Sequence, residues 1–161
     1  MNIVSVKNIA GQQDYLLKED ENTVLKLRYK QDMHTARVET EKERRVLLIE
    51  DEGLLKKKLV LKNEYGIRIG SMTYDNFSHT HGIVEIENTK YRFFITNAPI
   101  TELHIYKGTR RNLIYSCQLS FDDNSKEIKS QPASFIISVA WYLFLKGTVP
   151  AKPVFNDATI L

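Results

Sequence analysis

The longest apolar run in the sequence is Phe135-Ile136-Ile137-Ser138-Val139-Ala140-Trp141-Tyr142-Leu143-Phe144-Leu145. Ser138 alone interrupts this apolar run, so a helix formed here has no polar face. Pro132 is favoured in the first turn of a helix, and Lys146 and Gly147 are favoured at its end. The pattern predicts a helix over about residues 132–146. One long buried strand is the alternative, because periodicity cannot separate the two for an all-apolar run.

The rest of the chain is typical of consecutive β-hairpins, with β-branched and aromatic runs between short polar turns. Alternation places Tyr91, Phe93 and Ile95 on one face of a strand, and it places Ile67 and Ile69 together on another. Short connections favour antiparallel pairing, because parallel pairs need long crossovers. The expected strands are 3–7, 15–18, 24–29, 34–40, 45–49, 55–61, 67–74, 82–87, 91–96, 103–107 and 113–119.

These two patterns together predict the architecture. A helix that is apolar all round must be buried on every side or lie in a membrane, and this one is shorter than the roughly 20 residues that a membrane span needs. A single sheet covers one side of a helix, whereas a closed sheet covers all of them. We therefore expect a mainly β fold: a closed antiparallel barrel of about ten to twelve strands around a hydrophobic C-terminal helix. Residues 1–161 are expected to form one domain, with a tail over 148–161.

Composition narrows the class of protein. Of the 161 residues, 42% are hydrophobic and 27% are charged, which is typical of a globular protein. The net charge of +3 gives no strong overall field, so nucleic acid is not a predicted partner. The one cysteine cannot form an internal disulfide, and the N-terminus has no pattern of a signal or transit peptide. We expect a cytoplasmic protein.

Two segments carry a resemblance to a known family. They are Lys58-Leu59-Val60-Leu61-Lys62-Asn63-Glu64-Tyr65-Gly66-Ile67-Arg68-Ile69-Gly70 and Ala133-Ser134-Phe135-Ile136-Ile137-Ser138-Val139-Ala140. With the hairpin layout, they resemble the tubby-like superfamily, which includes tubby C-terminal domains, LURP-one-related proteins and phospholipid scramblases. The chain is closest in size to the LURP-one-related type. The resemblance implies a 12-stranded antiparallel barrel threaded by a hydrophobic C-terminal helix.

The chain departs from the family in ways that limit what carries over. It is shorter than a tubby domain and lacks tubby's C-terminal signature. It also has no cysteine cluster for acylation and no acidic calcium loop near the helix. Scramblase activity and calcium dependence are therefore not implied. Phosphoinositide binding, known for tubby domains, is implied only as a possibility, with no residue-by-residue site.

Clustered basic residues are the first candidate site. The expected outer face of one hairpin and the loop of another supply Lys56, Lys58, Lys62, Arg68, Arg110 and Arg111. Such clusters bind lipid phosphates at an anionic surface. A solvated outer face, or lysines that protect an edge strand, is the alternative.

Other residues give weaker indications of chemistry. His79 and His81 share a strand face and could ligate a metal, although a polar loop explains them as well. Cys117 alternates with apolar residues and is expected to pack as a small hydrophobic side chain. The sequence shows no catalytic constellation, metal site or cofactor motif. We therefore expect a non-enzymatic domain that binds anionic phospholipid headgroups or a membrane surface. The alternative is a protein-interaction or structural domain without a small ligand.

Overall fold

The structure is a computed structural model that describes residues 2–9, 11–53, 58–75, 80–96, 100–108, 112–121 and 133–148. Eleven strands and one helix occupy these ranges. The elements are β1 (Asn2–Ile9), β2 (Gln12–Glu19), β3 (Asn22–Lys30), β4 (Thr35–Thr40), β5 (Arg44–Glu52), β6 (Lys58–Lys62), β7 (Arg68–Tyr74), β8 (His81–Ile86), β9 (Thr89–Thr96), β10 (Glu102–Lys107), β11 (Leu113–Phe121) and α1 (Ala133–Thr148). The prediction of a mainly β fold with a C-terminal helix is confirmed.

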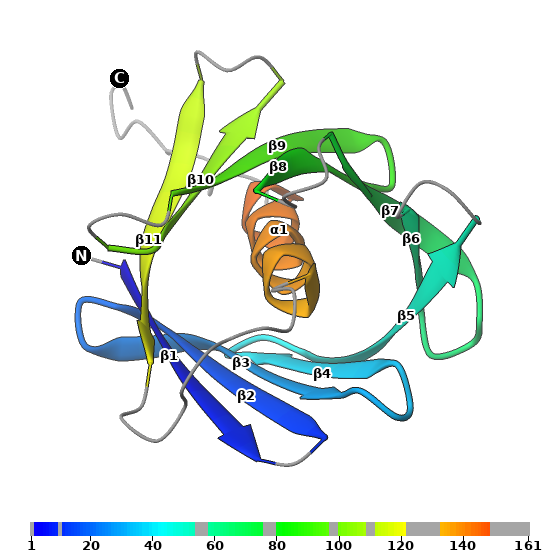
Figure 1. The fold of residues 1–161 in the computed structure, drawn as a ribbon, viewed down its shortest axis with the longest axis horizontal. Coiled ribbons are helices and arrows are strands. Elements are labelled where there is room, and N and C mark those ends of the chain that lie inside the picture. Colours follow the sequence, from blue (N-terminus) through cyan, green and yellow to red (C-terminus); the bar gives the residue numbers. More distant parts are fainter. Residues whose placement is uncertain are drawn as a thin grey trace, which may run out of the picture.

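The strands form a meander in which each pairs with its neighbours in sequence. From β2 to β11 every pair is antiparallel, and this antiparallel sheet does not close on itself. Strand β1 joins it by pairing antiparallel with β2 and parallel with β11, so the strand order returns to its start (Figure 1).

Two expectations, the twelve strands that the resemblance implies and antiparallel pairing throughout, therefore need correction. The described residues contain eleven strands, and the pair β1–β11 is parallel. The two corrections have one cause. In a meander, successive strands alternate in direction, so with an odd number of strands the first and last run the same way. Any pairing between them must then be parallel.

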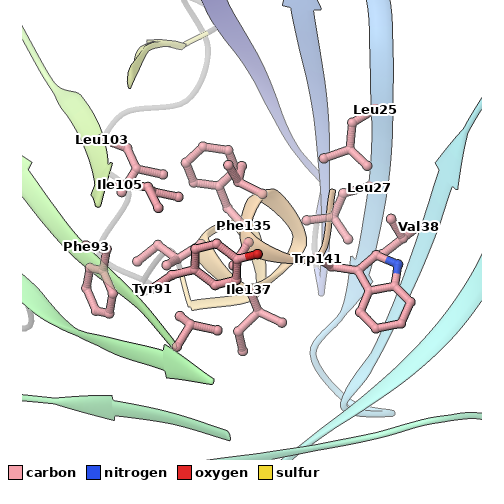
Figure 2. Close-up of a cluster of buried hydrophobic side chains, with 14 of the residues drawn as sticks. Leu25, Leu27, Val38, Tyr91, Phe93, Leu103, Ile105, Phe135, Ile137 and Trp141 are labelled. Atoms are coloured by element: carbon pink, nitrogen blue, oxygen red, sulfur yellow. The ribbon is translucent and has the colours of Figure 1, made fainter. Parts of the chain in front are cut away.

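The inner face of the sheet is apolar on every strand whose side chains are described. In β3, Leu25 and Leu27 are buried, while Lys26 and Arg28 between them are exposed. The same alternation buries Val38 in β4 and Phe93 in β9 (Figure 2). Period-two patterning therefore separates a dry inner face from a charged outer face.

Helix α1 lies inside this ring of strands (Figure 1). It contacts β3 and β4 on one side and β8 and β9 on another. Every residue from Ser134 to Trp141 is buried, and the ring of Phe135 stacks on that of Tyr15 with centroids 5.4 Å apart. The predicted burial of the apolar helix is confirmed. The alternative of a long C-terminal strand is wrong.

Most polar side chains of the helix have a hydrogen-bond or ion-pair partner. The buried hydroxyl of Ser138 donates to the carbonyl oxygen of Ser134 at 2.7 Å. Near the end of the helix, the Tyr142 hydroxyl donates to Glu19 Oε1 at 3.2 Å, and Lys146 Nζ lies 3.8 Å from Glu19 Oε2. The indole N–H of Trp141, by contrast, is buried without a hydrogen-bond partner among the described residues.

Two local predictions are wrong. The helix continues through Gly147 to Thr148 instead of ending at about 146. Ile67 was expected on the buried face with Ile69, but its side chain is 61% exposed. Ile67 belongs to the turn before β7, so strand alternation does not yet apply to it. The predicted tail and Pro132 lie outside the described residues.

Candidate functional site

The predicted basic hairpin is present in part. Lys58 and Lys62 lie at the two ends of β6, and Arg68 begins β7. Their side chains are partly exposed, at 39%, 31% and 50%. Lys56, Arg110 and Arg111 lie outside the described residues, so the structure does not test them.

Each of the three described cations of this hairpin lies beside a carboxylate of β5. Lys62 Nζ is 2.7 Å from Glu50 Oε2. Lys58 Nζ and Arg68 Nη1 lie 3.6 and 3.9 Å from the same oxygen, Oε2 of Glu52. Strand register accounts for the Lys58–Glu52 contact, because the two residues are directly opposite in the β5–β6 pair. Lys62 instead reaches Glu50 diagonally, since Glu50 is opposite Val60. We call these five side chains the paired face: Glu50, Glu52, Lys58, Lys62 and Arg68.

A second group of cations lies on the outer surface of β1–β5, where a hollow of about 710 Å³ is lined by charged side chains. The outward alternation of the strands explains why these long polar side chains gather there. We call its central side chains the basic face. The five cations of the basic face are Lys7, Lys26, Arg28, Arg37 and Arg44, and its two carboxylates are Asp14 and Glu39.

Only some of these cations have a carboxylate partner. Arg28 donates from Nε and Nη2 to the two oxygens of Asp14, at 3.0 and 3.2 Å. The hydrogen bonds to Asp14 raise the pKa of the Arg28 guanidinium. Arg44 lies 3.4 Å from Glu39. Among the described residues, no carboxylate comes within ion-pair distance of the remaining three cations, Lys7, Lys26 and Arg37.

The register of the strands sets one pair of cations, Arg28 and Arg37, directly against each other, and it sets Lys26 opposite Glu39. Lys7 is opposite Asp14, Asp14 is opposite Arg28, and Arg28 is opposite Arg37. Directly opposed side chains on neighbouring strands have Cβ atoms about 5 Å apart, and like charges at that separation destabilise a sheet. Asp14 offsets part of the repulsion between Arg28 and Arg37, and a bound anion would offset more of it.

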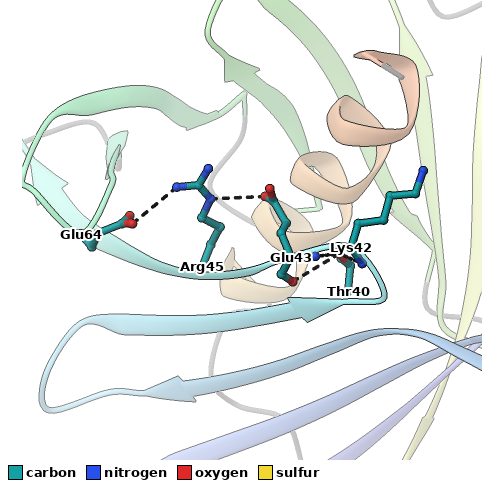
Figure 3. Close-up of polar contacts among 5 residues, drawn as sticks. All are labelled: Thr40, Lys42, Glu43, Arg45 and Glu64. Atoms are coloured by element: carbon teal, nitrogen blue, oxygen red, sulfur yellow. Dashed lines mark hydrogen bonds and ion pairs between the residues drawn. The ribbon is translucent and has the colours of Figure 1, made fainter. Parts of the chain in front are cut away.

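At one end, the hollow is bounded by a smaller charge network. The guanidinium of Arg45 lies 3.4 Å from Glu43 and 3.4 Å from Glu64, which belongs to the β6–β7 turn (Figure 3). Thr40 supports the adjacent β4–β5 turn, since its hydroxyl oxygen accepts from the backbone N–H groups of Lys42 and Glu43 (Figure 3). This network ties the β6–β7 turn to the edge of the basic face.

Sequence reasoning missed the basic face. Its cations come from four strands and form no run in the chain, so a search for clustered lysines passes over them. One indication was available: Lys26, Arg28 and Lys30 follow one another at every second position of β3. That spacing puts three cations on one side of a single strand.

The other candidate residues that the structure describes show no reactive arrangement. Cys117 is buried, and burial raises the pKa of its thiol to about 12, so the thiol is protonated at neutral pH. Its predicted role as a small core residue is confirmed. The ring of His81 stacks on Phe94 with centroids 5.6 Å apart, and His79 lies outside the described residues. No three potential metal ligands come together within the described part of the chain.

Comparison with known proteins gave no relative: no family model, no curated protein and no solved structure matches this chain. Among the described elements, no helix is long and apolar enough to cross a membrane. The resemblance to the tubby-like superfamily and the cytoplasmic location therefore stay predictions.

Proposed function

We propose that this protein is a non-enzymatic domain that binds anionic phospholipid headgroups at a membrane surface through the basic face. One observation carries the proposal: Arg28 and Arg37 are directly opposed on neighbouring strands, while Arg37, Lys26 and Lys7 have no carboxylate partner among the described residues. A phosphate group placed between the two guanidinium groups would offset their repulsion and accept hydrogen bonds from both.

The chemistry of the basic face favours phosphate-bearing ligands. Guanidinium groups fit phosphate oxygens in a forked geometry, and ammonium groups add unspecific attraction. Each basic residue close to an anionic membrane contributes about 1 kcal/mol. Five cations and two carboxylates on one outer surface would together give a weak, salt-sensitive affinity. The paired face contributes less, because its carboxylates offset its cations.

The location of the charges favours an extended surface, such as a membrane, as the binding partner. Lys7, Lys26, Arg28, Arg37 and Arg44 are all exposed and project from the outside of the sheet. A lipid surface can approach several such side chains at once. The barrel interior offers no comparable site, because the described inner face is apolar and helix α1 packs against it.

The proposal extends to the fold family and the location. A helix buried along most of its length within a β meander supports a tubby-like architecture, in line with the two segments that resemble that superfamily. A cytoplasmic protein that binds the inner surface of a membrane fits a lone, buried, protonated cysteine. Both statements are parts of the proposal.

Vesicle sedimentation tests the function. The protein should sediment with vesicles of phosphatidylserine and phosphatidylcholine but not with phosphatidylcholine alone. Binding should fall as salt rises from about 0.05 M to 0.5 M, because the screening length shortens. The double variant Lys26→Gln/Arg37→Gln should lose about 30-fold in affinity, at about 1 kcal/mol per charge.

The matched control is Lys58→Gln/Lys62→Gln, which removes the same number of charges from the paired face. It should lose much less, because each of its lysines already lies beside a carboxylate. The proposal fails if the wild-type protein ignores acidic vesicles at low salt. A stoichiometric protein partner that survives high salt would then favour the alternative, a protein-interaction domain.

A further inference from the structure

The β6–β7 turn exposes two large apolar side chains. Tyr65 is 81% exposed and Ile67 is 61% exposed, the two largest exposures among the large apolar residues of the described chain. Both lie within four residues of each other in one short turn, which we call the apolar tip (residues 63–67). Two large exposed apolar side chains in one turn form a candidate contact surface.

The apolar tip is held rigidly by its own backbone contacts. The side-chain oxygen of Asn63 accepts hydrogen bonds from the backbone N–H of Tyr65 at 3.0 Å and of Ile67 at 2.9 Å. The Asn63 N–H donates to the Ile67 carbonyl, and the Gly66 N–H donates to the Asn63 carbonyl. Gly66 has a φ of 78°, which glycine adopts at little cost. The backbone that carries the two side chains is therefore already ordered, so little further backbone ordering is needed on binding.

The cations around the apolar tip have carboxylate partners. Arg45 lies between Glu43 and Glu64 (Figure 3), and Lys62 lies beside Glu50. Matched charges weaken both attraction to an anionic surface and repulsion from it. Arg45 and Glu64 also line the hollow of the basic face, so the apolar tip and the basic face adjoin.

The size of the apolar tip argues against a protein partner. A stable protein–protein interface buries about 800 Å² on each partner, from some 20 residues or more. The apolar tip offers two side chains. A membrane needs no such area, because a few apolar groups at the headgroup boundary add to the attraction of nearby cations. Tyrosine favours that boundary, since its ring is apolar and its hydroxyl stays hydrated.

The neighbouring turns restrict how the protein can approach. Asp20, Glu21 and Glu41 lie in the β2–β3 and β4–β5 turns, which open at the same end of the meander as the apolar tip. These carboxylates would be repelled by an acidic membrane if the protein approached it with this end first. An approach tilted toward the outside of β1–β5 avoids them and brings the basic face and the apolar tip to the surface together.

We propose that Tyr65 and Ile67 insert into the boundary between headgroups and acyl chains while the basic face holds the anionic headgroups. This inference rests on the proposed function. It adds that binding has an apolar component, which high salt does not remove.

Tryptophan fluorescence tests the insertion in the full chain. Trp141 is the only tryptophan and is 8% exposed, so the wild-type spectrum should not change with vesicles. In Tyr65→Trp, the new indole should shift to the blue on phosphatidylserine vesicles and be quenched by brominated lipids. The control is Met33→Trp, because Met33 is 59% exposed in the β3–β4 turn at the opposite end of the meander. Its added indole should stay unshifted.

A second variant tests the insertion through the affinity for acidic vesicles. Tyr65→Ser/Ile67→Ser should sediment about tenfold more weakly, because the apolar burial is lost. The inference is overturned if Tyr65→Trp binds acidic vesicles without a blue shift or if the serine variant binds normally. The basic-face proposal survives either result. If the wild-type chain does not bind acidic vesicles at all, both proposals fall.

Discussion

The paired face and the basic face lie on the same outer surface of the sheet, but they differ in how many of their cations lie beside a carboxylate. On the paired face, Lys58 stands opposite Glu52 and Lys62 reaches Glu50 at 2.7 Å. On the basic face, Arg28 stands opposite Arg37. Register opposes like charges on both faces, because Lys62 is opposite Arg68 on the paired face. The faces differ in their carboxylates: each described cation of the paired face lies beside one from β5, whereas Lys7, Lys26 and Arg37 have none within ion-pair distance among the described residues. A run of lysines in the chain is therefore a poor guide to a basic surface.

The largest change in vesicle affinity is expected when the carboxylates of the paired face are removed. Glu50→Gln/Glu52→Gln removes the two carboxylates beside Lys58, Lys62 and Arg68. The paired face should then bind acidic vesicles as well, and affinity should rise about 30-fold, at about 1 kcal/mol per charge. Sedimentation at low salt measures it. An unchanged affinity would mean that matched carboxylates are not what keeps this face inactive.

A smaller gain is expected from the basic face itself. Asp14→Asn removes the carboxylate that holds Arg28 in a fork. Affinity for acidic vesicles should rise about fivefold, since one negative charge is lost. Urea unfolding, followed by Trp141 fluorescence, should show a slightly less stable protein, because Arg28 and Arg37 then face each other without a counter-charge. Weaker vesicle binding in this variant would contradict the account.

Much of the fold could be predicted from the sequence because it depends on local pattern. The run from Phe135 to Leu145 identifies a helix buried on all sides, and alternation in β3 and β9 identifies the inner face. The parallel β1–β11 pair could not be predicted without an exact strand count. The exposure of Ile67 was missed because the turn before β7 extends one residue further than the pattern suggests.

The candidate site was less predictable than the fold. Lys58, Lys62 and Arg68 were identified as cations, but the carboxylates that match them come from β5. Arg28 and Arg37 are separated by a turn, and nothing local indicates that they meet. Such contacts depend on strand register. The hydrophobic pattern shows which face of the sheet a side chain lies on, but it does not show which residue is opposite it on the next strand.

The smallest effects concern stability. Lys62→Gln should lower the free energy of unfolding by less than about 1 kcal/mol, because an exposed ion pair is lost. Arg37→Gln should raise it by a few tenths of a kcal/mol, roughly the repulsion between opposed like charges. Urea titrations of the two variants against wild type provide the comparison. A fall in stability for Arg37→Gln would show that the opposed arginines cost nothing.

Charge reversal at one position tests most directly whether the unmatched cations bind the anionic surface. Arg37→Glu changes the basic face by two charges, and Lys62→Glu makes the same change on the paired face. In parallel sedimentation with acidic vesicles at low salt, Arg37→Glu should lose about 30-fold in affinity, and Lys62→Glu should lose less than about threefold. Equal losses in the two variants would contradict the account, because net charge alone would then govern binding.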